Sequence, residues 1–165
     1  MDLATWILSA TAVLSPNKDH ARFAHATAAV VEAEAPLFDS DDDRHKTAAL
    51  VVAIAYRESG FKLDAVGDHG RSLCAMQIHY GAKELLTDPE RCIRAGMRIL
   101  RSSVSACKAH PIAVYAHGPT GCTSPRAQQV SLDRMKLAKR VLTSANAAAE
   151  PAAPAAKAPD LVQTH

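Results

Sequence analysis

The chain has 165 residues, of which 48% are hydrophobic, 22% are charged and only 4% are aromatic. This length and composition suit one compact domain and favour helices over sheets. The formal net charge is only +2, and no basic cluster is interleaved with aromatic residues, so nucleic acid is not an expected partner. No apolar stretch is long enough to cross a membrane, so a membrane span is not expected either.

The first part of the chain predicts two helices followed by a loop. Residues 2–14 form an apolar helix that ends before a proline, and residues 19–34 form a second, Ala-rich helix. The first run has the length of a signal-peptide core, but no basic segment precedes it, so a signal peptide is not favoured. Residues 36–43 are expected to form a loop whose acidic run suits the positive end of the next helix.

The third predicted helix has no polar face. It spans residues 47–56 and continues into Glu58 before Gly60, a residue type that commonly ends helices. A helix that is apolar all round is usually buried. Glu58 therefore lies at a buried helix C-terminus, where both burial and the helix dipole disfavour its ionised form. A carboxyl with a raised pKa suits general acid catalysis. The alternative is that Glu58 pairs on the surface with Arg57 or Arg71.

The second part of the chain predicts a loop region, further helices and a tail. Residues 61–80 are rich in turn signals, with a short hairpin expected near residues 72–78. Asp88 and Pro89 predict a helix start, because an acidic cap precedes a proline in the first turn. The remaining expected elements are a short helix at 111–115, a turn at 118–121, a last helix at 131–142 with basic residues on its outer face, and an Ala/Pro-rich disordered tail at 145–165.

The four cysteines leave two alternatives open. None forms a CxxC pair, so a zinc site is not expected. An even number permits two disulfides in an oxidising compartment. Four free thiols that behave as small buried hydrophobes are an equal alternative. Cys107 and Cys122 are the pair to test first as a disulfide; the other two are Cys74 and Cys92.

Three short motifs follow one another along the chain: Glu58-Ser59, Met76-Gln77, and Tyr115 with Gly118. Through these motifs, residues 45–142 resemble the lytic transglycosylases, enzymes of the lysozyme-like superfamily that cleave peptidoglycan. In that family a Glu-Ser pair ends a buried helix, and a Gly-rich loop then leads into a Gly-Leu-Met-Gln-like segment. Here Glu58-Ser59 precedes a Gly-containing loop and Met76-Gln77, residues 88–96 look like the next family helix, and residues 114–118 look like its Ala-Tyr-Asn-x-Gly element. Four positions depart from the family pattern: Cys74, Ala75, Cys92 and Ala116.

The resemblance implies a mainly α, lysozyme-like α+β fold over residues 1–144, with a substrate groove and at most a small hairpin. It implies that Glu58 protonates the oxygen between N-acetylmuramic acid and N-acetylglucosamine. The resulting carboxylate would then deprotonate the C6 hydroxyl, closing a 1,6-anhydro ring without water. No metal or cofactor is implied, and the expected partner is the glycan strand of peptidoglycan.

The resemblance also implies supporting roles. Met76 and Gln77 are expected to line the cleft, and Ser72 to contact the N-acetyl group of the substrate. Tyr115 is expected to hold Glu58 or a substrate oxygen, and Ser59 to fix the helix end. Two acidic residues in the loop are expected to be turn formers, and three histidines have no matched role; these are Asp64, Asp68, His69, His79 and His117.

Two other functions remain as alternatives. One is a goose-type lysozyme on the same fold, which would use water and leave reducing ends. The other is a non-catalytic cell-wall-binding or virion structural domain. In every case the site of action is the cell wall, reached in the periplasm, outside the cell or through phage delivery, and the sequence does not choose between a bacterial and a phage setting.

Overall fold

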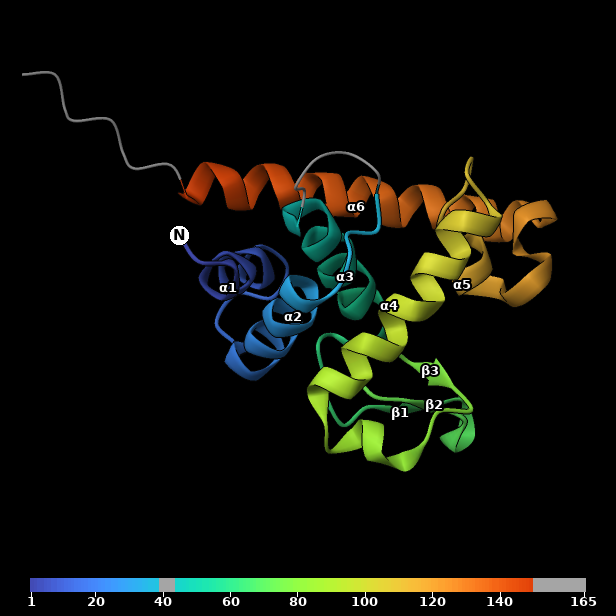
Figure 1. The fold of residues 1–165 in the computed structure, drawn as a ribbon, viewed down its shortest axis with the longest axis horizontal. Helices are drawn as coiled ribbons and strands as arrows, with labels where there is room; N and C mark the ends of the chain where they lie inside the picture. The colour runs from blue at the N-terminus through green and yellow to red at the C-terminus, as the bar shows by residue number, and fades with distance from the viewer. Residues whose placement is uncertain (39–43, 150–165) are drawn as a thin grey trace, which may run out of the picture.

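The computed structural model describes residues 1–38 and 44–149. The predicted mainly helical fold is confirmed, and the sheet has three short antiparallel strands where a hairpin was expected (Figure 1). The acidic residues 39–43 and the tail residues 150–165 lie outside the described part. The elements are α1 (Leu3–Leu14), α2 (Ala21–Ala33), α3 (Arg44–Ser59), β1 (Val66–Gly67), η1 (Asp68–Gly70), β2 (Ser72–Leu73), β3 (Ile78–His79), η2 (Lys83–Leu86), α4 (Pro89–Ala106), α5 (Ala113–His117), η3 (Gly118–Thr123) and α6 (Pro125–Ala149).

Helix α3 is the centre of the core. Every residue from Thr47 to Ala55 is buried, as its apolar sequence predicts. Helix α6 runs along α3 and reaches from α1 to α5, so it joins both ends of the helical part (Figure 1). The C-terminal end of α3 therefore lies between α6 and the small sheet, where the candidate site is found.

Helix α1 packs into this core. Its buried residues include Trp6 and Ile7, and its first turn is capped by the Asp2 carboxylate, which accepts a hydrogen bond from the Thr5 backbone N–H at 2.9 Å.

Among the described residues, no helix combines the length and the apolar character that a membrane crossing needs.

Helix α6 is longer than the sequence predicted at both ends. It begins at Pro125, where the Ser124 side chain accepts a hydrogen bond from the Ala127 backbone N–H at 3.3 Å. At the other end, the predicted tail start at 145 is wrong, because Ala145 is buried against the core. The next residue, Asn146, accepts a 2.8 Å hydrogen bond from the Trp6 indole N–H, so these contacts extend the helix to Ala149.

The sheet is held to α4 by a disulfide that the sequence did not single out. Cys74, in the turn between β2 and β3, is bonded to Cys92 near the start of α4. The predicted Cys107–Cys122 disulfide is wrong in this structure, since both residues are free thiols. They are nonetheless neighbours. A hydrogen bond between the two side chains raises the pKa of the Cys122 thiol.

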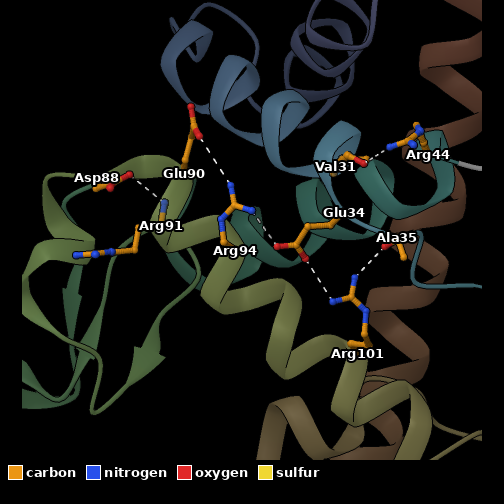
Figure 2. A network of polar contacts seen from close by, with 9 residues as sticks. All are labelled: Val31, Glu34, Ala35, Arg44, Asp88, Glu90, Arg91, Arg94 and Arg101. Carbon is orange, nitrogen blue, oxygen red and sulfur yellow. Dashed lines mark hydrogen bonds and ion pairs between the residues drawn. The ribbon is translucent and has the colours of Figure 1, made fainter.

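A half-buried acidic residue fixes α4 against the end of α2 (Figure 2). Glu34 binds Arg94 at 3.2 Å and Arg101 at 3.3 Å, and Arg101 also donates to the Ala35 carbonyl at 2.8 Å. The Glu34 side chain is only 15% exposed, so two guanidinium partners compensate its desolvation. This network orients α4, whose other face contacts the sheet.

Candidate active site

Glu58 lies in the last turn of α3. The helix ends as predicted at Gly60, which adopts a φ of 61° that suits glycine. Ser59 has the expected supporting position, since its hydroxyl donates to the Ala55 carbonyl at 3.1 Å and to the Ala75 carbonyl at 3.0 Å. The second bond ties the helix end to the turn between β2 and β3. Glu58 is thereby held between the helix and the sheet.

The partner of Glu58 is an arginine that the sequence analysis did not identify. Arg134 of α6 places a guanidinium nitrogen 2.7 Å from the Glu58 carboxylate. The pairs with Arg57 or Arg71, which were considered as an alternative, are not formed. The two side chains are only 21% and 14% exposed, so this ion pair is largely shielded from water. The other terminal nitrogen of Arg134, Nη1, is buried without a hydrogen-bond partner among the described residues.

Opposing effects act on the ionisation of Glu58. Burial raises the pKa of this carboxyl and is the largest effect, while the charge and the hydrogen bond of Arg134 lower it. The negative charge of Asp68 raises it further. The net direction is upward from the ordinary value of 4.5. Glu58 therefore keeps its proton to a higher pH than an exposed glutamate does.

Glu58 faces a polar cleft of about 720 Å³ between the sheet, α5 and α6. Four of the predicted site residues line this one cleft together, although they come from separate parts of the chain. They are Glu58, Ser72, Gln77 and Tyr115. Further lining residues are Asp68, Ile78, His79, Ile99, Val114, Ala116, His117, Gly118 and Arg134.

Gln77 reaches the cleft because a glycine stands beside it. A Cβ atom added at Gly67 would lie 2.1 Å from the Gln77 amide oxygen, so only glycine leaves this side chain its place. The Gln77 amide nitrogen donates to the Cys74 carbonyl at 3.1 Å. Both residues adopt positive φ values, 64° at Cys74 and 48° at Gln77. Cys74 thus has a conformation that glycine adopts more easily.

Tyr115 and Met76 have positions that differ from the expected ones. The Tyr115 hydroxyl donates to the Met76 carbonyl at 2.5 Å and is not bonded to Glu58. Burial and the nearby charge of Glu58 raise the pKa of Tyr115, so this group stays a neutral donor. The expectation that Met76 lines the cleft is wrong, because its side chain is fully buried and packs where Gly96 of α4 leaves room.

Three polar side chains form a cluster on the sheet side of the cleft. The buried Ser72 hydroxyl donates to the Asp68 carboxylate and lies 3.2 Å from Nδ1 of His79. His79 Nδ1 is 3.9 Å from the same carboxylate. The Ser72 hydroxyl, predicted to contact the substrate, is thus engaged with Asp68. Asp68, expected to be a turn former, supplies a second carboxylate to the cleft.

No family model matches the chain. No curated protein and no solved structure matches it at a significant level either. The candidate site therefore depends on the geometry described above and on the sequence motifs. In the described ranges, no group of three or more His, Cys, Asp or Glu side chains is placed to hold a metal ion.

Arg134 carried a signal that the sequence analysis did not use. It lies three residues after Ser131 and four before Ala138, and both of these are buried on the inner face of α6. This spacing places Arg134 on the same face, whereas basic residues were expected only on the outer face. His79 and His117 had no such signal, because loops and short elements bring them to the cleft.

Proposed function

We propose that the protein is a peptidoglycan lytic transglycosylase with a lysozyme-like fold, and that Glu58 is its general acid and base. One observation carries this proposal: a carboxyl with a raised pKa lies at the end of a buried helix and faces a polar cleft. Such a carboxyl is protonated more often near neutral pH than an exposed one, as cleavage of a glycosidic bond requires. The ordered motifs at residues 58–59, 76–77 and 114–118 support the same reaction.

The reaction proceeds in two proton transfers. Glu58 gives its proton to the oxygen between N-acetylmuramic acid and N-acetylglucosamine while the bond from that oxygen to C1 breaks. The Glu58 carboxylate then accepts the proton of the C6 hydroxyl, and the C6 oxygen bonds to C1. Glu58 ends protonated, as it began, and no water is consumed.

Arg134 fits this cycle because its effect differs between the two states of Glu58. The guanidinium is 2.7 Å from the carboxylate and stabilises the ionised form that follows the first proton transfer. Burial acts in the opposite direction and restores the protonated form. Because the two effects oppose each other, protonated Glu58 can donate its proton in the first step. The Glu58 carboxylate can then accept a proton in the second step.

A goose-type lysozyme activity is the second candidate, and Asp68 favours it. This carboxylate lines the same cleft, and its charge acts on Glu58. Most glycosidases that use water have a second carboxylate across the scissile bond from the acid. In this alternative Asp68 would orient the attacking water, with His79 beside it.

Product analysis distinguishes these functions. Purified sacculi are digested in ¹⁸O-labelled water, and the soluble fragments are identified by mass spectrometry. We expect 1,6-anhydro-muramyl ends without ¹⁸O. Reducing ends that carry ¹⁸O would overturn transglycosylation in favour of hydrolysis. Binding to sacculi without soluble fragments would overturn both activities in favour of a wall-binding or structural domain.

A further inference from the structure

A second groove of about 610 Å³ lies along α4 and adjoins the candidate active-site cleft at Ile78. Ile78 lines both hollows, and Ile99 of the cleft directly follows Arg98 of the groove. The groove lies between α4 and the segment from β3 to η2, and its remaining lining residues are Gly81, Ala82, Leu85, Asp88, Glu90, Arg91, Arg94 and Ala95. A polymer that enters the cleft at Glu58 can therefore extend past Ile78 into this groove.

The groove presents two arginines that have no acidic partner within residues 1–38 and 44–149. Arg91, Arg94 and Arg98 share one face of α4, since they are three and four residues apart. Arg94 is engaged with Glu34 at 3.2 Å and with Glu90 at 4.0 Å. In the described part of the chain, neither Arg91 nor Arg98 forms a salt bridge, and Figure 2 shows the Arg91 guanidinium pointing away from the Glu34 network.

The two acidic residues of the groove do not neutralise these arginines. Asp88 caps α4, where its carboxylate accepts a hydrogen bond from the Arg91 backbone N–H at 2.9 Å. Glu90 faces Arg94. Two exposed arginines are thus left along the groove. They are seven residues apart on one helix, so their backbone positions are separated by roughly 10 Å along the helix axis. A neutral sugar chain does not need such charges, whereas carboxylates bind guanidinium groups in a paired, directional way.

We propose that this groove binds the carboxylates of peptide stems on the glycan strand, with Arg91 and Arg98 as the binding residues. The inference rests on the proposed function, because it takes the glycan strand as the occupant of the adjoining cleft. It adds a substrate preference: the groove selects strands whose stems carry free carboxylates over strands whose stem carboxylates are amidated.

The test measures binding and not cleavage. Fluorescently labelled stem-bearing glycan strands, either with free stem carboxylates or with these carboxylates converted to amides, are titrated into the full chain that carries Glu58→Gln. In this background, the double variant Arg91→Gln/Arg98→Gln is compared with the control variant Arg140→Gln. Arg140 is an exposed arginine on α6 that lies outside both hollows. We expect the double change to weaken binding of strands with free stem carboxylates about tenfold at low salt, less at high salt, and to leave amidated strands unaffected.

Two outcomes would overturn the groove assignment. One is an equal loss of affinity for both kinds of strand, which indicates general attraction or damage to the fold. The other is unchanged affinity for strands with free stem carboxylates. Because this binding measurement needs no turnover, the two proposals fail separately. Absence of soluble products from the wild-type protein would refute the proposed activity, whereas the binding comparison tests whether the groove binds stem carboxylates.

Discussion

The ion pair between Arg134 and Glu58 makes a prediction about pH. Replacement of Arg134 by methionine keeps much of the volume of the side chain but removes its charge and hydrogen bond. Both of these lower the pKa of Glu58 in the wild-type protein, against the larger effect of burial. Without them the pKa of Glu58 rises further. Since the acid must be protonated to act, the activity should persist to higher pH in the Arg134→Met variant.

The structure sets the size of the effect. The two side chains are 2.7 Å apart and mostly shielded from water. An arginine in this position lowers the pKa of the carboxyl, so the alkaline limb of kcat/KM should move to higher pH when the arginine is removed. Loss of one partner of a buried pair also costs about 3–5 kcal/mol of folding free energy near neutral pH. The cost should shrink in acid, where Glu58 is neutral in both proteins.

The assay is the pH dependence of kcat/KM on solubilised glycan strands, with the unfolding free energy measured at neutral and acidic pH. Arg140→Met is the matched control, since it removes an exposed arginine from the same helix. An alkaline limb at the same pH in the wild type and in Arg134→Met would refute the reasoning. So would an equal loss of stability at both pH values, because the pair would then not depend on the ionisation of Glu58.

Three further substitutions test the surroundings of the cleft. Gly67→Ala should displace the Gln77 amide, whose oxygen would lie 2.1 Å from the new Cβ. We expect glycan affinity to fall roughly fivefold, as for one lost hydrogen bond. A binding titration with Gln77→Ala should show the same loss of affinity. Tyr115→Phe removes the hydroxyl that binds a backbone carbonyl at 2.5 Å, so denaturant unfolding should show a loss of about 1–2 kcal/mol while the pH profile stays unchanged. Cys74→Ser combined with Cys92→Ser opens a disulfide with a sequence separation of 18 residues, and calorimetry should show about 3 kcal/mol less stability.

Each of these predictions has a contradicting result. Unchanged affinity in Gly67→Ala would mean that Gln77 does not contact the glycan. A shifted pH profile in Tyr115→Phe would assign its hydroxyl a role in proton transfer. Unfolding of the wild type that is insensitive to a reducing agent would show that the bond between Cys74 and Cys92 does not support the fold.

The sequence predicted the elements whose signals are local. The apolar run at 47–56 predicts a buried helix, and the structure buries it as far as Ala55. Asp88 caps α4 as expected, because an acidic cap followed by proline needs no tertiary contact. Glu58, Ser72, Gln77 and Tyr115 line one cleft, whereas Met76, expected in the same cleft, is buried in the core.

What the sequence left undetermined depends on contacts between distant segments. The pairing of Cys74 with Cys92 follows from how α4 lies against the sheet, and spacing alone does not determine it. The continuation of α6 through residues 145–149 depends on contacts with the core such as that of Asn146 with Trp6. An Ala-rich segment without such contacts is indistinguishable from a tail by composition. The partner of Glu58 is likewise supplied by a helix that begins about 70 residues later in the chain.

The most direct test of the account compares the wild-type protein with Glu58→Gln on purified peptidoglycan, with the soluble fragments measured by mass spectrometry. Glutamine preserves the shape of the side chain but cannot donate the proton. We expect the rate of fragment release to fall roughly 10²- to 10⁴-fold, with circular dichroism showing an intact fold and sacculus binding retained. Equal rates of release in the two proteins would contradict the assignment of Glu58 as the catalytic acid.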